Sequence, residues 1–255
     1  MPVSVGTYYF LHEGSKEGQK PPVVLLHGAG GSNLFWPPEI RRLPGYRVYA
    51  PDLPGHGKSG GSGFQSISEY VISILDWLEA IGLHSAVFVG FSMGSAIALS
   101  LALDYPDQVK GLGLIGAGAR LRVAADILRS ASSQTTFENG VHNVVEASFS
   151  SSTPNQLKML TEKRMKEIRQ SVFLGDLIAC DQFDVLERIA SIHQPTVVIS
   201  GSEDRLTPLK YSQFLADHIP GATLESISRA GHMVTLERPE LVASILRGFL
   251  DRINY

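Results

Sequence analysis

The sequence predicts an α/β fold in which a mainly parallel sheet is flanked by helices. Short runs rich in β-branched residues alternate with stretches of helical periodicity, which is the pattern of βαβ units. Several of these runs, such as residues 23–26 and 86–89, are apolar throughout, as expected for strands that helices cover on both faces. With 255 residues, 44% of them hydrophobic, the chain is long enough for one substantial core, with or without an insertion.

Seven strands and four helices are expected in the sheet-forming part of the chain. The predicted strands span residues 3–10, 23–26, 46–50, 86–89, 111–115, 196–200 and 223–227. The predicted helices span residues 66–81, 93–105, 208–218 and 239–253. The first helix opens with Ser66 and Glu69, which have the spacing of a capping box that satisfies free backbone N–H groups.

Residues 119–193 interrupt this alternation and are predicted to form a helical cap packed on the open end of the sheet. Helical patterns occur at 123–130, 141–149 and 155–170, with no convincing strand between them. The alternative, two further βα units, lacks a supporting β-branched run. The predicted α/β core therefore comprises residues 1–118 and 194–255.

Composition argues against several classes of partner. The formal net charge is −3, so no overall field attracts nucleic acid or an anionic membrane. Cys180 is the single cysteine, which excludes an internal disulfide, and no Cys/His cluster has zinc-like spacing. The N-terminus lacks a basic segment followed by an apolar run, so we expect a soluble, cytoplasmic protein. We also expect that the protein needs no metal or cofactor. The sequence leaves the oligomeric state open.

The strongest chemical motif is Gly90-Phe91-Ser92-Met93-Gly94, at the junction of a predicted strand and a predicted helix. This G-x-S-x-G pattern in that context predicts a nucleophile elbow, a tight turn that presents the serine. A Cβ atom two residues before or after the serine would collide with the turn, so glycine is needed there. Ser92 is the predicted nucleophile.

A serine hydroxyl is a poor nucleophile at neutral pH and needs a base, which in turn needs an orienting carboxylate. His232 follows the last predicted strand, and Asp204 follows the strand at 196–200, so both should lie at the same sheet edge as Ser92. The order serine, aspartate, histidine along the chain is the order expected for this arrangement. Glu203 is the nearest alternative to Asp204, and Asp126 is a more remote one.

The oxyanion formed by nucleophilic attack needs fixed hydrogen-bond donors. We assign one to the backbone N–H of Met93, directly after the nucleophile. The second is assigned to the backbone N–H of Ala29, in the glycine-rich loop at residues 27–31. A phosphate cradle is the alternative for this loop, but it lacks both the G-x-G-x-x-G spacing and the Walker lysine.

These motifs together resemble the α/β-hydrolase family, and the resemblance extends over most of the chain. The matching segments are residues 23–28, 51–59, 90–94, 201–204 and 231–232. The resemblance implies that Asp52 and His56 are architectural and that His27 braces the oxyanion loop. Relatives often have a glycine where this chain has Ser95, a departure expected to alter only the packing behind the elbow.

The resemblance implies a serine hydrolase. Some relatives use an aspartate as nucleophile, and Ser92 argues against that group. We expect a carboxylesterase that cleaves short- to medium-chain esters through an acyl-enzyme. A carbon–carbon bond hydrolase or enol-lactonase with the same triad is the first alternative, since Arg120, Arg122 or Arg164 could hold a substrate carboxylate. A ligand-binding protein without activity is the second alternative.

Apolar side chains near the catalytic motifs are candidates for the substrate pocket. Phe91 and Met233 adjoin the nucleophile and the base, and Phe35 follows the oxyanion loop. The predicted pocket is therefore suited to a small-molecule ester.

Overall fold

The computed structural model describes residues 2–14 and 20–253, and its centre is an eight-stranded sheet. The strand order is β1-β2-β4-β3-β5-β6-β7-β8, with β1 and β2 antiparallel to their neighbours and all other pairs parallel. The strands are β1 (Val3–Ser4), β2 (Thr7–Glu13), β3 (Val23–Leu26), β4 (Arg47–Pro51), β5 (Ala86–Phe91), β6 (Val109–Ile115), β7 (Thr196–Gly201) and β8 (Thr223–Ile227). The predicted mainly parallel sheet is confirmed.

The N-terminal strand differs from its prediction. Residues 3–10 were expected to form one strand, but the chain turns back at Val5 and Gly6, whose φ angles are 45° and 78°. Two successive residues with positive φ form the tight turn that suits the twist of a two-stranded hairpin. The result is the antiparallel pair β1 and β2 at one edge of the sheet.

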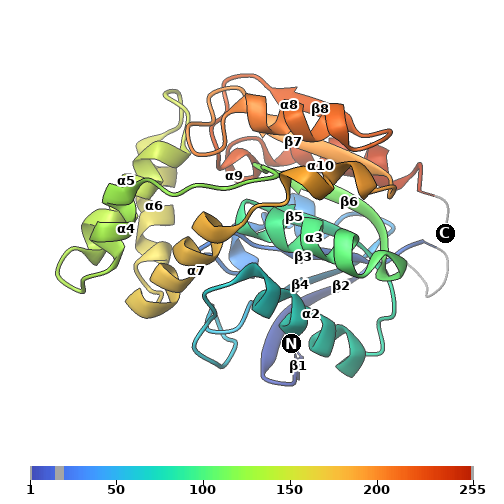
Figure 1. The fold of residues 1–255 in the computed structure, drawn as a ribbon, viewed down its shortest axis with the longest axis horizontal. Helices are drawn as coiled ribbons and strands as arrows, with labels where there is room; N and C mark the ends of the chain where they lie inside the picture. Colours follow the sequence, from blue (N-terminus) through green and yellow to red (C-terminus); the bar gives the residue numbers. More distant parts are fainter. Residues whose placement is uncertain (1, 15–19, 254–255) are drawn as a thin grey trace.

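Helices cover both faces of the sheet and complete two apolar layers (Figure 1). Within β3, Val24 and Leu26 point into the layer covered by α2 (Ile67–Ala80), α3 (Met93–Asp104) and α8 (Leu209–His218). Val23 and Leu25 point into the opposite layer, covered by α1 (Pro38–Arg41), the short α9 (Val234–Glu237) and α10 (Pro239–Leu250). This alternation follows from the two-residue period of a strand and explains why the central strands are apolar throughout.

Helices also occupy the stretch between β6 and β7, beyond one end of the sheet in Figure 1. They are α4 (Ala125–Ala131), α5 (Phe137–Ser148), α6 (Asn155–Met165) and α7 (Gln170–Gln182), followed by the 3₁₀ helix η3 (Leu186–Ser191). We refer to residues 119–193 as the cap; these boundaries stay a prediction.

One helix predicted within the cap is wrong in length, and one was missed. The expected helix at 155–170 ends at Met165, and α7 begins five residues later at Gln170. No proline or glycine marks this break, so packing overrides local propensity. The buried residues of α7 lie on several of its faces, so the helix has no single apolar stripe from which a sequence could reveal it. Across the described residues, no helix is long and apolar enough to cross a membrane.

Candidate active site

Ser92 lies on a sharp turn between β5 and α3, at the carboxyl edge of the sheet. Its φ and ψ are 53° and −116°, a strained conformation for a residue with a side chain. A Cβ on Gly90 would come within 2.2 Å of the Gly94 carbonyl oxygen, and one on Gly94 would come within 2.0 Å of the Leu26 carbonyl oxygen. Both contacts are impossible, so the expected need for glycine on either side of Ser92 is confirmed.

Hydrogen bonds to the next strand hold this turn. The Ser92 N–H donates to the Ile115 carbonyl at 2.9 Å. The Ser95 hydroxyl donates to the Gly90 carbonyl at 2.7 Å and accepts the Ile115 N–H at 3.2 Å. Ser95, expected to alter only packing, therefore ties the start of α3 to both β5 and β6.

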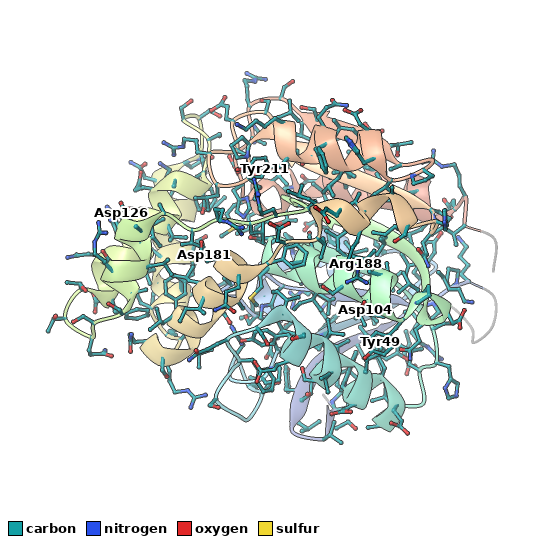
Figure 2. All side chains as sticks on the ribbon, in the orientation of Figure 1. Tyr49, Asp104, Asp126, Asp181, Arg188 and Tyr211 are labelled. Atoms are coloured by element: carbon teal, nitrogen blue, oxygen red, sulfur yellow. The ribbon has the colours of Figure 1, made fainter. Side chains whose placement is uncertain are left out.

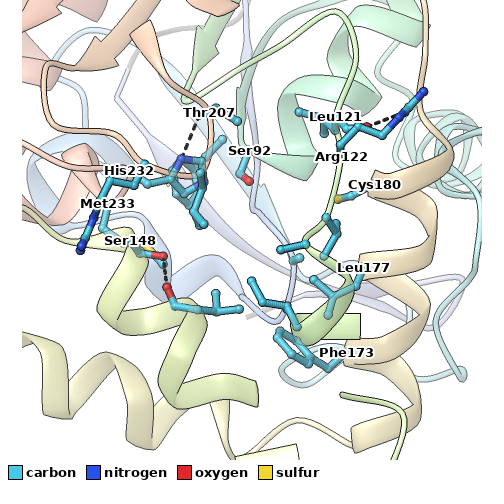
Figure 3. Close-up of a pocket in the computed structure, with 18 of the residues that line it drawn as sticks. Ser92, Leu121, Arg122, Ser148, Phe173, Leu177, Cys180, Thr207, His232 and Met233 are labelled. Atoms are coloured by element: carbon cyan, nitrogen blue, oxygen red, sulfur yellow. Dashed lines mark hydrogen bonds between the residues drawn. The ribbon is translucent and has the colours of Figure 1, made fainter. Parts of the chain in front are cut away.

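His232 and Asp204 form a buried pair beside the turn that carries Ser92. The Nδ1 of His232 lies 2.8 Å from Oδ2 of Asp204. Thr207 donates its hydroxyl to the same carboxylate oxygen at 2.7 Å and lies 3.1 Å from the same ring nitrogen (Figure 3). A ring nitrogen facing a carboxylate is the donor, which leaves Nε2 as the ring nitrogen that can accept a proton.

The Asp204 carboxylate is fixed by its surroundings. Its Oδ1 accepts the backbone N–H groups of Leu206 at 2.9 Å and Thr207 at 2.8 Å. Burial alone would raise the pKa of Asp204, but the His232 ring and the Thr207 hydrogen bonds outweigh it and lower that pKa. Asp204 is therefore an anion at neutral pH, oriented before any substrate arrives.

The other two candidate carboxylates lie elsewhere. Glu203 points away from His232 and accepts hydrogen bonds from the backbone and side chain of Ser151 in the cap. Asp126 is exposed on α4, toward the outer end of the cap (Figure 2). Only Asp204 of the three contacts His232.

The glycine-rich loop after β3 forms a tight turn beside Ser92. The Gly31 N–H donates to the Gly28 carbonyl at 3.1 Å, and Gly30 has a φ of 65°. Ala29, at the tip of the turn, lines the same pocket as Ser92. Met93 is the first residue of α3, so its N–H has no acceptor within the helix. Both assigned donors thus lie close to Ser92.

His27 holds this loop in place through hydrogen bonds of a neutral imidazole ring. Its Nδ1 donates to the Gly28 carbonyl at 2.9 Å, and its Nε2 accepts the Leu53 N–H at 3.0 Å. Complete burial lowers the pKa of His27 to about 3. Asp52 is likewise architectural, because its carboxylate accepts bonds from the backbone and side chain of Asn33 and from the Lys58 N–H.

Ser92 and His232 lie in the wall of one cavity of about 190 Å³ between the core and the cap (Figure 3). Core loops supply Phe91 and Met233 to this wall, and the cap supplies Phe173 and other apolar residues. The cap and loop residues that the sequence did not single out include Ala124, Ile127, Val144, Met165, Leu177 and Leu206. Their identity depends on how the cap packs, which no local motif reveals.

Phe35 does not line this cavity. It is buried at 3% exposure, and its ring lies against Gly31 behind the loop, where it borders a different cavity. The loop turns back on itself between Ala29 and Phe35, which places these residues on opposite sides of it. Proximity in sequence was therefore a poor guide to proximity in the site.

Two arginines border the cavity, and each donates hydrogen bonds to other groups of the protein. Arg122 donates to the carbonyls of Leu121 and Asp181 at 2.6 and 2.8 Å and pairs with Asp184 at 3.3 Å. Arg205, which the sequence did not single out, donates to the carbonyls of Glu146 and Phe149 near the end of α5. Arg164 borders the cavity behind the oxyanion loop, and Arg120 borders a separate cavity near α8.

Thr207 is the functional neighbour that sequence reasoning missed. It follows Asp204 by three residues and immediately precedes the proline at the start of α8. An aspartate that accepts the N–H groups two and three residues later is a common turn, and that spacing was the available signal. Within the described part of the chain, no group of three or more His, Cys, Asp or Glu side chains could hold a metal ion.

Known proteins resemble this chain over most of its length. A family model described as the alpha/beta hydrolase fold matches residues 21–239. The chain is 28% identical to 3-oxoadipate enol-lactonase 1 of Acinetobacter baylyi over 92% of this chain and 90% of that protein. It is 29% identical to 2-hydroxymuconate semialdehyde hydrolase of Pseudomonas putida over 94% and 89%. The solved structure of a thermophilic esterase has a TM-score of 0.81 at 32% identity, covering 97% of this chain and 99% of that one. The chain therefore belongs to the α/β-hydrolase family.

Proposed function

We propose that this α/β-hydrolase is a carboxylesterase that cleaves short- to medium-chain esters, with Ser92 as nucleophile. The main support is the buried His232–Asp204 contact of 2.8 Å in a cavity wall that also contains Ser92. A base held by an anion next to a serine on a strained turn is the arrangement that nucleophilic hydrolysis requires.

In the proposed reaction, Ser92 Oγ attacks the ester carbonyl carbon while Nε2 of His232 takes the hydroxyl proton. Collapse of the tetrahedral intermediate breaks the bond to the alcohol oxygen, which leaves with the proton from His232. Water then attacks the acyl-enzyme, and His232 again accepts a proton and returns it to Ser92. Asp204 stays ionised throughout and stabilises the imidazolium that forms twice in the cycle.

The negative charge on the carbonyl oxygen is stabilised by the backbone N–H groups of Ala29 and Met93 in this proposal. Both are fixed before substrate binds, so they cost no reorganisation in the transition state. The partial positive charge at the start of α3 acts in the same direction.

A neutral, apolar acyl group fits the cavity best. Its volume of about 190 Å³ is small, below the range of about 300–1,000 Å³ typical of pockets for drug-sized ligands. Its lining is mainly aliphatic and aromatic, and the two guanidinium groups at its border are already bound to protein carbonyls and Asp184. These bonds hold both guanidinium groups in place and occupy part of their donors, which makes them less suited to follow a substrate carboxylate.

A carbon–carbon bond hydrolase or enol-lactonase is the second candidate. It is favoured by the names of the two relatives described above and by the presence of Arg122 and Arg205 at the cavity border. The two candidates share the catalytic residues and differ in whether these arginines bind substrate.

The test combines a substrate panel with a nucleophile variant. We expect turnover of p-nitrophenyl acetate to hexanoate, with weaker activity on longer esters and none on acidic dienones or enol-lactones. Ser92→Ala should lower kcat by about 10⁴ to 10⁶ and abolish labelling by a fluorophosphonate probe. Near-wild-type hydrolysis by Ser92→Ala would remove the assignment, and turnover confined to acidic substrates would favour the second candidate.

A further inference from the structure

Asp176 on α7 is a fully buried carboxylate that joins the cap to three parts of the core. Its Oδ1 accepts the Tyr70 hydroxyl at 2.6 Å. Its Oδ2 accepts hydrogen bonds from the Nε2–H group of His56 at 2.7 Å and from the backbone N–H of Gly30 at 2.8 Å. Because Gly30 belongs to the loop that carries Ala29, a residue of the cap is bonded directly to the loop that borders the catalytic cavity.

The partner His56 is a buried cation. Its Nδ1 lies 3.0 Å from the Pro54 carbonyl, and its Nε2 faces the carboxylate of Asp176. Neither partner has a proton to donate, so both ring nitrogens must donate. Burial alone would lower the pKa of His56, but the adjacent Asp176 carboxylate outweighs it and raises that pKa. Asp176 and His56 therefore form a buried ion pair, unlike the neutral His27 whose ring centre lies 4.9 Å from that of His56.

The bond to Gly30 fixes one particular peptide unit. The turn at residues 28–31 closes with the 3.1 Å bond from the Gly31 N–H to the Gly28 carbonyl, and Gly30 alone has positive φ within it. This combination matches a type II turn, which differs from type I by a flip of the central peptide, here the one between Ala29 and Gly30. Asp176 accepts the N–H of that peptide. After a flip, the Ala29 carbonyl oxygen would face the carboxylate and repel it. The Ala29 N–H belongs to the preceding peptide, so the Asp176 bond affects it by anchoring the residue that follows it.

Packing brings Asp176 within reach of the turn. A Cβ on Gly175, the preceding residue, would lie 2.6 Å from the Phe64 carbonyl oxygen, so glycine is what allows α7 to approach the core this closely. Phe173, one turn earlier, would lie 2.9 Å from a Cβ on Gly30. The oxyanion loop is therefore held directly against α7.

We propose that Asp176 is a positioning residue, which from the cap anchors Gly30 and so fixes where the adjacent Ala29 N–H lies relative to the developing oxyanion. This inference rests on the proposed ester hydrolysis. Asp176 itself touches no reacting atom; it acts through Gly30. Its loss should affect the transition state, where the oxyanion exists, much more than the binding of the neutral substrate.

The test compares Asp176→Asn with Tyr70→Phe on a p-nitrophenyl ester that the wild type hydrolyses. An asparagine has a single acceptor oxygen for three donors, so the turn is released for part of the time. We expect kcat to fall by about 10- to 100-fold with KM within about 3-fold of wild type, since loss of one oxyanion donor costs about 10²- to 10³-fold. Tyr70→Phe removes one bond to Asp176 but leaves the Gly30 bond, so its kcat should stay within about 3-fold of wild type.

Equal losses of kcat in the two variants would overturn the proposal, because the effect would then come from general loosening of the buried cluster. A folded Asp176→Asn variant with wild-type kcat would also overturn it. Should that variant fail to fold, Gly175→Ala decides: it keeps every polar group but pushes α7 away from Phe64. It should lower kcat by at least about 3-fold at unchanged KM, and an unchanged kcat would contradict the proposal. Failure of the proposed function is distinguishable, because the wild type itself would then neither turn over esters nor be labelled at Ser92.

Discussion

The turn that carries Ser92 and the loop that carries Ala29 border one cavity, yet they are held in different ways. The Ser92 turn is fixed within the core, by Gly90 and Gly94 and by hydrogen bonds to β6. The Ala29 loop is fixed from two sides, by His27 in the core and by Asp176 in the cap. The Ser92 turn should therefore tolerate changes in the cap that the Ala29 loop does not.

The largest expected effect comes from a substitution that disrupts the Ser92 turn. Gly94→Ala places a Cβ 2.0 Å from the Leu26 carbonyl oxygen, and forcing backbone segments apart in this way should cost about 3 kcal/mol or more. Thermal unfolding should occur roughly 6–12 °C below wild type. Gly248→Ala is the control, because no atom lies within 4 Å of its added Cβ on the exposed face of α10; it should gain about 0.5 kcal/mol. Equal melting of the two variants would contradict the steric argument.

A second effect tests whether the segment at residues 231–232, which carries His232, is also held in place by contacts with the cap. Glu237 is buried and accepts the Gly231 N–H at 2.7 Å through one oxygen, and the Ser150 N–H at 3.1 Å and the Thr153 hydroxyl through the other. Glu237→Gln places an NH₂ group against these donors and should cost about 2 kcal/mol in urea unfolding.

Glu203→Gln is its matched control, because Glu203 also bonds to the cap but is less buried. Its cost should be within about 0.5 kcal/mol. If the two variants lose the same stability, burial of the Glu237 bonds is not what holds the segment at residues 231–232.

A smaller effect concerns the back of the Ser92 turn. Ser95→Ala removes the 2.7 Å bond to the Gly90 carbonyl and leaves the Ile115 N–H without its hydroxyl acceptor, at a cost of about 1.5 kcal/mol. Activity below the melting range should change little, since Ser92 keeps its own bond to the Ile115 carbonyl. Ser100→Ala, on the same helix, should alter unfolding by no more than about 0.5 kcal/mol. If the two variants unfold at the same urea concentration, the hydrogen bonds of the Ser95 hydroxyl do not contribute to stability.

The smallest effect is a dependence of stability on pH. The folded-state pKa of His56 is raised above its unfolded value of about 6.5. Its contribution is therefore fully present below about pH 6.5 and is lost as pH rises through the folded pKa. The stability difference between wild type and Asp176→Asn, measured by urea unfolding from pH 6 to 8.5, should shrink with rising pH. A difference that grows would reverse the sign we assign.

Taking the difference in stability between wild type and Asp176→Asn removes the pH-dependent contributions of the other titratable groups that face the Asp176–His56 pair, because both proteins contain them. These groups are His27, Asp52, Tyr70 and Cys180.

Features of the molecule that depend on local chemistry could be predicted from the sequence. The strands β3, β5 and β7 and the Ser92 turn follow from apolar runs and from the small residues a tight turn needs. Asp204 and His232 could be found because parallel strands end at one sheet edge, so residues after β7 and β8 meet there.

What the sequence did not reveal depends on contacts between distant segments. Phe35 was misplaced because the chain reverses at residues 28–31. The helix α7, its residue Asp176 and the cavity-lining Leu177 were missed, because the packing of the cap against the core determines their roles. The 120 residues that separate His56 from Asp176 carry no pattern that would pair them.

The bond between Gly30 and Asp176 has a consequence for protein engineering. Exchanging caps between α/β-hydrolases is a natural way to transfer substrate preference, since the cap supplies much of the cavity wall. A transplanted cap that lacks an acceptor at this position would leave a buried N–H and the His56 cation without a partner. In this protein, a chimera should therefore retain α7 from Gly175 onward, whichever helices are replaced before it.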